Sequence, residues 1–146
     1  MDYNKKKEQD TWDEDEPDCP NRWMLQGFVV NTGSDISSTA NVSLRYNGDG
    51  METVAFGMGP IDAAFHAIEN LVESGAQLAS YTIHSMSRGV DAQGEVIVQL
   101  ERDGKQITGR GMSADIIDAS IKAYLDGVNQ LISGQSGEHT GPCHGK

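Results

Sequence analysis

Residues 57–68 read GMGPIDAAFHAI and residues 109–124 read GRGMSADIIDASIKAY, and this pair of stretches decides the fold. Each begins with Gly-x-Gly and continues into a helical pattern that starts on Asp-Ala, at Asp62–Ile68 and again at Asp118–Tyr124. The glycines lie further from the helical match in the second stretch, which predicts a small insertion there. Internal repetition of this kind indicates one structural unit used twice.

Three strand patterns precede the first glycine turn. Met24–Asn31 is rich in Leu, Phe and Val, Thr39–Tyr46 alternates apolar and polar residues, and Met51–Phe56 predicts a third strand. Between the last two, residues 47–50 (NGDG) tolerate the positive φ angles that a tight hairpin requires.

The same order recurs before the second turn. Leu78–Met86 predicts a strand, Arg88–Asp91 a loop, Glu95–Glu101 an alternating strand, and Lys105–Thr108 a last strand that leads to the glycines. Asp103-Gly104 supplies the hairpin between the last two strands.

Each unit then ends in a helix. Gly59-Pro60 is typical of a helix start and Ser74-Gly75 of a helix end, because proline suits the first helical position and glycine the end. In the second unit we expect Ser113 as the N-cap, with Asp115 in the first turn. Two apolar stripes at helical spacing predict the buried faces, one with Ile61, Ala64, Phe65, Ile68 and Val72, the other with Ile117, Ile121, Tyr124, Val128 and Ile132.

These patterns predict an α+β domain that covers residues 23–133. It is built from a duplicated β-β-β-α unit, about 23–75 and about 76–133, as two antiparallel three-stranded sheets each backed by a helix. Each half is too small for a stable core, so we expect the halves to pack through a pseudo-two-fold axis. A true two-fold on the same surfaces would build a homodimer.

The remaining residues and the composition limit the classes of function. Residues 1–22 are interpreted as a disordered acidic tail, as a tether or as a remnant of truncation, and residues 134–146 as a flexible tail. The net charge of -11 argues against nucleic-acid and membrane partners. Cys19 and Cys143 form no disulfide framework, and no apolar run is long enough for a membrane span, which together favour a cytoplasmic protein.

A Gly-x-Gly turn that opens a helix points backbone N–H groups outward at the positive end of the helix dipole. Such a turn suits a carboxylate or phosphate, although a plain strand-to-helix connection needs the same glycines. Two copies at equivalent places favour a shaped cavity between the helix starts, but duplication alone would also produce them.

Other chemistry is weakly represented in the sequence. The glycines do not match a dinucleotide or P-loop pattern, and His66 and His84 have no Glu-His or Cys-His partner at ligand spacing. Metal binding by His139, Cys143 and His144 would be adventitious in a Gly-rich tail. We therefore expect no cofactor, no resident metal and no catalytic residue, and we interpret the chain as a binding module.

At the glycine turns the sequence resembles the C-terminal regulatory domain of 2-isopropylmalate synthase. Residues 57–64 (GMGPIDAA) look like that family's Gly-Asn-Gly-Pro-Val-Asp-Ala motif, with Met58 in place of the usual Asn and Ile61 in place of the Val. Residues 81–86 (YTIHSM), 91–96 (DAQGEV) and 108–120 (TGRGMSADIIDAS) match further parts of the pattern. The likeness spans about residues 23–132 and rests on several motifs in the right order.

The resemblance implies that this domain dimerises and binds an end-product amino acid as a feedback inhibitor. Leucine is the first expectation, and isoleucine, the effector of the related citramalate synthases, is the next. The pocket is expected at the dimer interface. Its candidate residues are Gly57, Met58, Gly59, Ile61, Leu78, Tyr81, Ser85, Ala92, Met112, Ser113 and Asp115.

The resemblance leaves two hypotheses open. In the first, the chain is an amino-acid-sensing domain without catalysis of its own, which works with a separate or fused catalytic synthase domain. In the second, it is a dimerisation subunit of such a synthase that binds no effector, an alternative that Met58 motivates.

Overall fold

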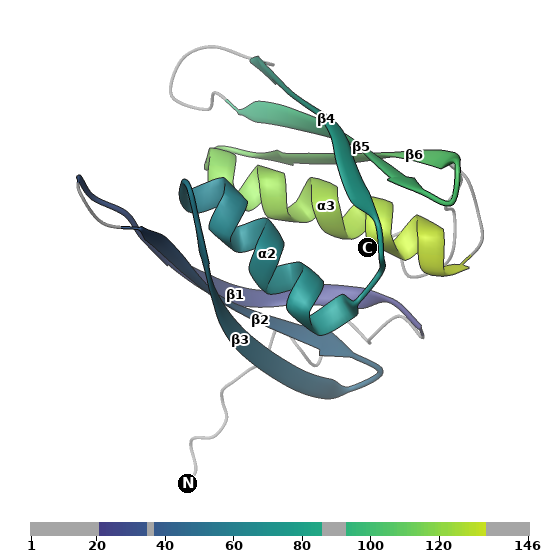
Figure 1. The fold of residues 1–146 in the computed structure, drawn as a ribbon, viewed down its shortest axis with the longest axis horizontal. Helices are drawn as coiled ribbons and strands as arrows, with labels where there is room; N and C mark the ends of the chain where they lie inside the picture. Colours follow the sequence, from purple (N-terminus) through teal and green to yellow (C-terminus); the bar gives the residue numbers. More distant parts are fainter. Residues whose placement is uncertain (1–20, 35–36, 86–92, 134–146) are drawn as a thin grey trace, which may run out of the picture.

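The structure, a computed structural model, describes residues 21–34, 37–85 and 93–133, and runs β-β-β-α twice (Figure 1). The first unit forms an antiparallel sheet in the order β1-β2-β3, and the second forms one in the order β4-β5-β6. Their elements are β1 (Trp23–Asn31), β2 (Ser38–Tyr46), β3 (Asp49–Gly57), α2 (Pro60–Val72), β4 (Gln77–Ser85), β5 (Gly94–Arg102), β6 (Lys105–Ser113) and α3 (Ile116–Ser133). This order confirms the predicted α+β fold of two β-β-β-α units.

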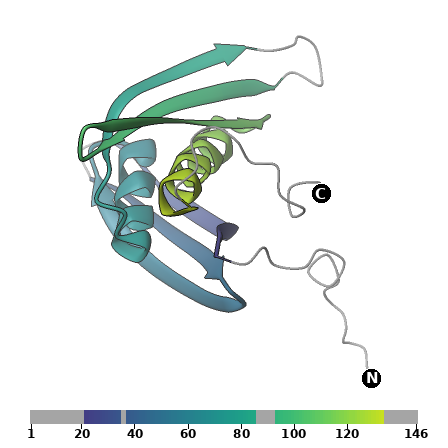
Figure 2. The same cartoon turned by 90° about the vertical axis from the view of Figure 1, so that its right-hand side faces the viewer.

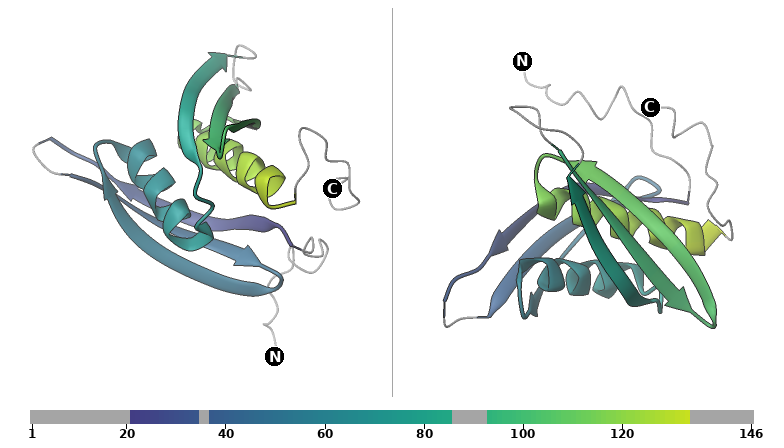
Figure 3. Two further views of the ribbon diagram at one scale, coloured as in Figure 1. Left: turned by 45° about the vertical axis from the view of Figure 1, so that its right-hand side comes forward. Right: turned by 90° about the horizontal axis from the view of Figure 1, so that it is seen from above.

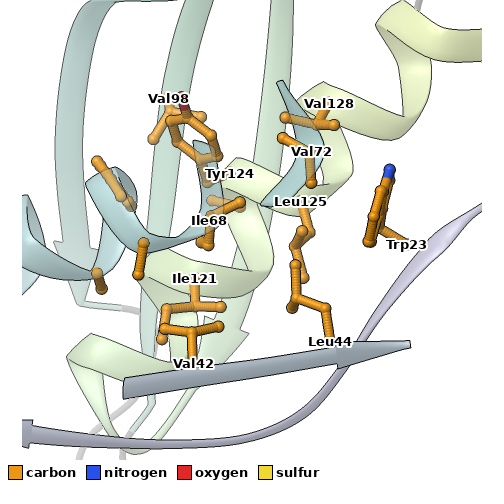
Figure 4. Packing of buried hydrophobic residues seen from close by; sticks show 14 of the residues in the cluster. Trp23, Val42, Leu44, Ile68, Val72, Val98, Ile121, Tyr124, Leu125 and Val128 are labelled. Atoms are coloured by element: carbon orange, nitrogen blue, oxygen red, sulfur yellow. The ribbon is translucent and has the colours of Figure 1, made fainter. Parts of the chain in front are cut away.

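Both helices lie between the two sheets, so the domain has three layers (Figures 1 and 2). Apolar residues from both units meet there in one core (Figure 4). Its largest fully buried side chains include Leu44 and Ile68 from the first unit and Leu100 and Ile121 from the second. Burying each such side chain stabilises the fold by about 1.5–3 kcal/mol. Since these side chains come from both units, the two units share one core and depend on each other for stability.

The two units keep one spacing along the chain. The bounds of β2, β3 and the start of α2 differ by 56 residues from those of β5, β6 and the start of α3. The first strands each carry a bulge, between Leu25 and Gly27 in β1 and between Leu78 and Ser80 in β4. Counting from these bulges, Val30 of β1 corresponds to Ile83 of β4.

The expected insertion before the second helix was wrong. Two residues separate β3 from α2 and two separate β6 from α3, and Gly109 and Gly111 lie inside β6. A Cβ at Gly109 would lie 2.2 Å from the Ala123 carbonyl oxygen, and one at Gly111 would lie 2.3 Å from that of Ala119. These glycines therefore let α3 pack closely on β6 and do not form a turn.

The predicted helix ends also need correction. Asp115, and not Ser113, immediately precedes α3, and its side chain accepts a hydrogen bond from the Ile117 amide at 2.9 Å. Helix α2 ends one residue before Glu73, whose left-handed backbone (φ 47°) caps it ahead of Ser74-Gly75. The predicted stripe of α3 is buried except at its ends, since Ile117 is half-buried and Ile132 is 38% exposed.

Except for β4, the observed strands are slightly longer than predicted, because the ladders continue into the residues that flank each apolar run. β6 gains most, since it extends through the glycines to Ser113. The predicted loop Arg88–Asp91 and the predicted strand end at Met86 lie outside the described residues.

Candidate functional site

The first strand of the first unit is held by the helix of the second. The Trp23 amide donates to Asn129 Oδ1 at 2.7 Å, and Asn129 Nδ2 donates to the Trp23 carbonyl at 3.0 Å. Both residues are buried. This two-bond clamp fixes the start of β1 against α3.

The first strand of the second unit has much less cover. Leu78, Tyr81 and Ile83 pair with the buried Leu100, Val98 and Val96 of β5, so all three point to the core face of the sheet. Leu78 is nevertheless 44% exposed and Ile83 49% exposed, whereas Val30, the counterpart of Ile83, packs against the core. We call these three side chains the open face of β4.

Helix length explains the difference. α3 has 18 residues and packs on β5, β6 and β1, whereas α2 has 13 residues and packs on β1, β2 and β3 (Figure 3). The position that corresponds to Asn129 is Glu73, where α2 has already ended. The first unit therefore lacks the helical turns that would clamp the first strand of the second unit.

Tyr81 is the member of the open face that contacts both helices. Its hydroxyl lies 2.7 Å from the hydroxyl of Ser120 in α3. Its ring stands edge-on to Phe65 of α2, with a centroid separation of 6.2 Å. Ser120 in turn donates to the Ile116 carbonyl at 2.7 Å, so the phenol of Tyr81 is held in place beside the start of α3.

The start of α2 keeps backbone donors without a side-chain cap. Gly59 is the N-cap, and among the described residues no side chain caps this helix. Asp62 instead turns back and accepts a hydrogen bond from the Met58 amide at 2.9 Å. His66 Nδ1 donates to the Phe56 carbonyl at 3.0 Å, which holds the end of β3 to the helix.

The start of α3 is occupied by its own side chains. Asp115 Oδ1 accepts from the Ile117 amide, and Ser113 Oγ accepts from the Asp115 amide at 3.1 Å. Asp115 thus occupies an amide of the first turn of α3, whereas Asp62 in the first turn of α2 bonds the Met58 amide ahead of the helix. Of the two helix starts, that of α2 is therefore the better place for a bound anion.

The predicted site residues fall into three groups. Both helices begin on the same side of the molecule, at the left of Figure 1. The junction of β3 and α2 carries Gly57, Met58, Gly59 and Ile61, the junction of β6 and α3 carries Met112, Ser113 and Asp115, and β4 carries Leu78, Tyr81 and Ser85. Ala92 lies outside the described residues. Met58 is 95% exposed and Met112 45% exposed.

One chain does not bring all three groups together. Leu78 follows α2 after a short linker, so it lies near the end of α2 opposite to Gly59. A helix of this length spans about 20 Å, which a single amino acid cannot bridge. Tyr81, by contrast, is joined to α3 near its start through Ser120.

Two features were missed from the sequence. Ile83 belongs to the open face, and its alternation with Tyr81 in the predicted strand would have indicated it. A shallow hollow lies on the outer face of the first sheet, lined by Gly27, Phe28, Val29, Asn41, Ser43 and Glu52. The hollow forms at the β1 bulge, which left no clear pattern in the sequence.

The described residues offer no competing metal centre, since no three His, Cys, Asp or Glu side chains among them gather into a ligand set. Within the same residues, neither helix is long and apolar enough to cross a membrane.

Residues 10–132 match the family model described as the LeuA allosteric (dimerisation) domain. The chain is 45% identical over 113 residues to the 2-isopropylmalate synthase of Heliobacterium modesticaldum and 44% identical over 114 residues to that of Carboxydothermus hydrogenoformans. It is 46% identical over 112 residues to the 2-isopropylmalate synthase of Aromatoleum aromaticum. Each alignment covers 77% of this chain but 22% of the relative, so the chain spans about a fifth of these curated proteins.

Proposed function

This chain belongs to the family of LeuA allosteric (dimerisation) domains, and we propose that it binds a branched-chain amino acid, leucine first and isoleucine next. The open face of β4 carries this proposal, because it is an apolar part of the core face that the chain itself leaves exposed. The effector serves as a feedback inhibitor of a 2-isopropylmalate synthase, the activity named for the relatives.

The chemistry of leucine suits the exposed groups. Its aliphatic side chain would pack against Leu78 or Ile83 of the open face, each at least 44% exposed. Its carboxylate would bind the amides at the start of α2, where Gly59 leaves the donors without a side-chain cap. An acidic side chain or backbone carbonyls would hold the ammonium group.

A homodimer would bring these groups into one pocket. Gly59 and Leu78 lie near opposite ends of α2 in one chain, so a pocket that includes both needs a second copy. The second copy would also cover the open face of β4, as α3 covers β1. Effector binding would then favour one dimer arrangement, which the synthase part of the enzyme would sense.

The rest of the proposal is taken from the 2-isopropylmalate synthase family. The chain has no catalysis of its own and acts on a catalytic synthase domain, fused or separate, in the cytoplasm. The short coverage of the relatives fits this role, because most of their length lies outside the matched domain.

Calorimetric titration with leucine, isoleucine and valine, combined with sedimentation, tests the proposal. We expect a dimer that one of these amino acids stabilises by about 2.7 kcal/mol at a hundredfold excess over Kd. Discrimination between leucine and isoleucine should amount to about 1–3 kcal/mol, since it depends on the placement of one methyl group. Absence of both binding heat and a thermal shift with all three would refute effector binding.

The alternative is a dimerisation unit that binds no effector. The internal hydrogen bonds of the Met58, Asp115 and Ile117 amides favour it, because they remove donors from both helix starts. A stable dimer whose melting temperature is the same with every amino acid would support this alternative.

A further inference from the structure

Hydrogen bonds from the linker between the two units, residues 73–76, converge on the side-chain carboxylate of Glu69. Glu69 lies in the last turn of α2, and its Oε2 accepts a hydrogen bond from the Gly75 amide at 2.8 Å. The Ser74 hydroxyl donates to the same carboxylate, 2.8 Å from Oε1. Ser74 Oγ also accepts from the Ala76 amide at 3.1 Å, so the linker is held residue by residue up to the start of β4.

The same carboxylate reaches the second unit. The Tyr124 hydroxyl of α3 donates to Glu69 Oε1 at 3.0 Å. Burial, and then the charge of Glu69, raise the pKa of Tyr124 far above its usual value of 10, so the phenol remains a donor. Glu69 therefore joins the end of α2, the linker and α3 at one point.

A second contact ties the linker to the second sheet. Arg102, at the end of β5, donates from Nη1 to the Ser74 carbonyl at 2.9 Å. Ser74 is 5% exposed, and this bond and the one from its hydroxyl to Glu69 are partly buried. β4 follows directly, and further along it Tyr81 contacts Phe65, whose ring lies 4.6 Å from that of Tyr124.

We propose that Glu69 is a positioning residue of the effector site. Its carboxylate joins the linker to α3 and so fixes the orientation of the open face of β4 relative to α2 and to a second copy. This inference rests on the proposed effector function. It adds a residue that touches no effector but controls the affinity for it.

Three variants separate the parts of this arrangement. Glu69→Ala removes the carboxylate, and with it both oxygens on which the Gly75 amide and the Ser74 and Tyr124 hydroxyls converge. Tyr124→Phe removes the α3 bond and leaves the linker bonds intact. Glu73→Ala is the matched control, because it removes the same group from an exposed side chain four residues away.

Two measurements on these full-length chains test the proposal. Residual dipolar couplings report the orientation of β4 relative to α2, and amide exchange reports the Gly75 hydrogen bond. For Glu69→Ala we expect a changed orientation, at least tenfold faster exchange at Gly75, and at least fivefold weaker binding of the amino acid that binds the native chain. Glu73→Ala should match the native chain in all three, and Tyr124→Phe should change orientation without exposing the Gly75 amide.

The outcomes distinguish this inference from the function on which it rests. If the native chain binds no amino acid, the effector function fails, while the dipolar couplings still decide whether Glu69 positions β4. If Glu69→Ala frees the Gly75 amide but leaves orientation and effector affinity unchanged, Glu69 only caps a turn, and the proposal is overturned.

Discussion

The two units share a plan but differ in how tightly each helix is attached. In the second unit, Gly109 and Gly111 let α3 approach β6 to backbone contact, and Asp115 caps the helix start. In the first unit, the residues at the positions of these glycines are Thr53 and Ala55, and the start of α2 has no side-chain cap among the described residues. The two units therefore share a fold but differ at their helix starts. The first unit, whose helix start has no side-chain cap among the described residues, is the one to examine for anion binding.

The first strands differ in the opposite sense. β1 belongs to the more loosely built unit but is clamped by Asn129, whereas β4 belongs to the tighter unit and keeps Leu78 and Ile83 exposed. Each unit thus leaves one group open, the helix start in the first and the strand face in the second. Both openings arise from the first unit's shorter, uncapped helix.

Adding a methyl group at the close contact between β6 and α3 should have the largest effect on stability. Gly109→Ala places a Cβ 2.2 Å from the Ala123 carbonyl oxygen, so strand and helix must separate. Because backbone cannot move aside as a side chain can, we expect a loss of about 3 kcal/mol in the free energy of unfolding, measured by urea denaturation.

Gly27→Ala is the control for this substitution, because a Cβ there meets nothing within 4 Å. We expect a change within about 0.5 kcal/mol. Equal losses for both variants would show that α3 does not depend on close approach to β6.

Breaking the clamp on β1 should have the next largest effect. Asn129→Ala leaves the buried amide and carbonyl of Trp23 without partners, which should cost about 2 kcal/mol of stability. Faster amide exchange should appear in β1 and not in β4. Glu73→Ala, at the corresponding position of the first unit, should change stability by less than about 0.5 kcal/mol, and a loss as large as that of Asn129→Ala would contradict the asymmetry.

Copying the cap of the second unit into the first should have the smallest effect on stability. Gly59 already has the extended backbone of an N-cap residue (φ −154°), so Gly59→Asp should raise the free energy of unfolding by only about 0.3 kcal/mol. It should also weaken effector binding at least tenfold, because the new carboxylate occupies the place proposed for that of the effector. Thermal melts with and without leucine measure both, and a capped variant that binds as tightly as the native chain would exclude the start of α2 from the site.

The sequence predicted the repeat because the helical match at Asp62 and Asp118 is strong and the hairpins are marked by Asn47-Gly48 and Asp103-Gly104. It misplaced the second glycine pair because Gly-x-Gly looks the same in a turn and in a strand that touches a helix. The hairpins lie 56 residues apart, as do the two aspartates, and this common spacing would have placed Gly109 inside the last strand.

The candidate site was only partly accessible from the sequence. The apolar alternation at Leu78, Tyr81 and Ile83 predicts a core face, but only tertiary packing decides whether a helix covers it. The cap at Asp115 was also ambiguous, since Ser113 and Asp115 both suit a helix start. No local sequence pattern indicated that Glu69 would accept hydrogen bonds from the linker and from α3.

The clamp between Trp23 and Asn129 makes the two units interlock, since α3 of the second unit closes over β1 of the first. A chain cut within residues 73–76 would therefore yield two fragments, neither with a complete core and each carrying the surface that the other lacks. Such fragments should reassemble when mixed, so that the domain would serve as a split reporter whose halves recombine without a covalent link.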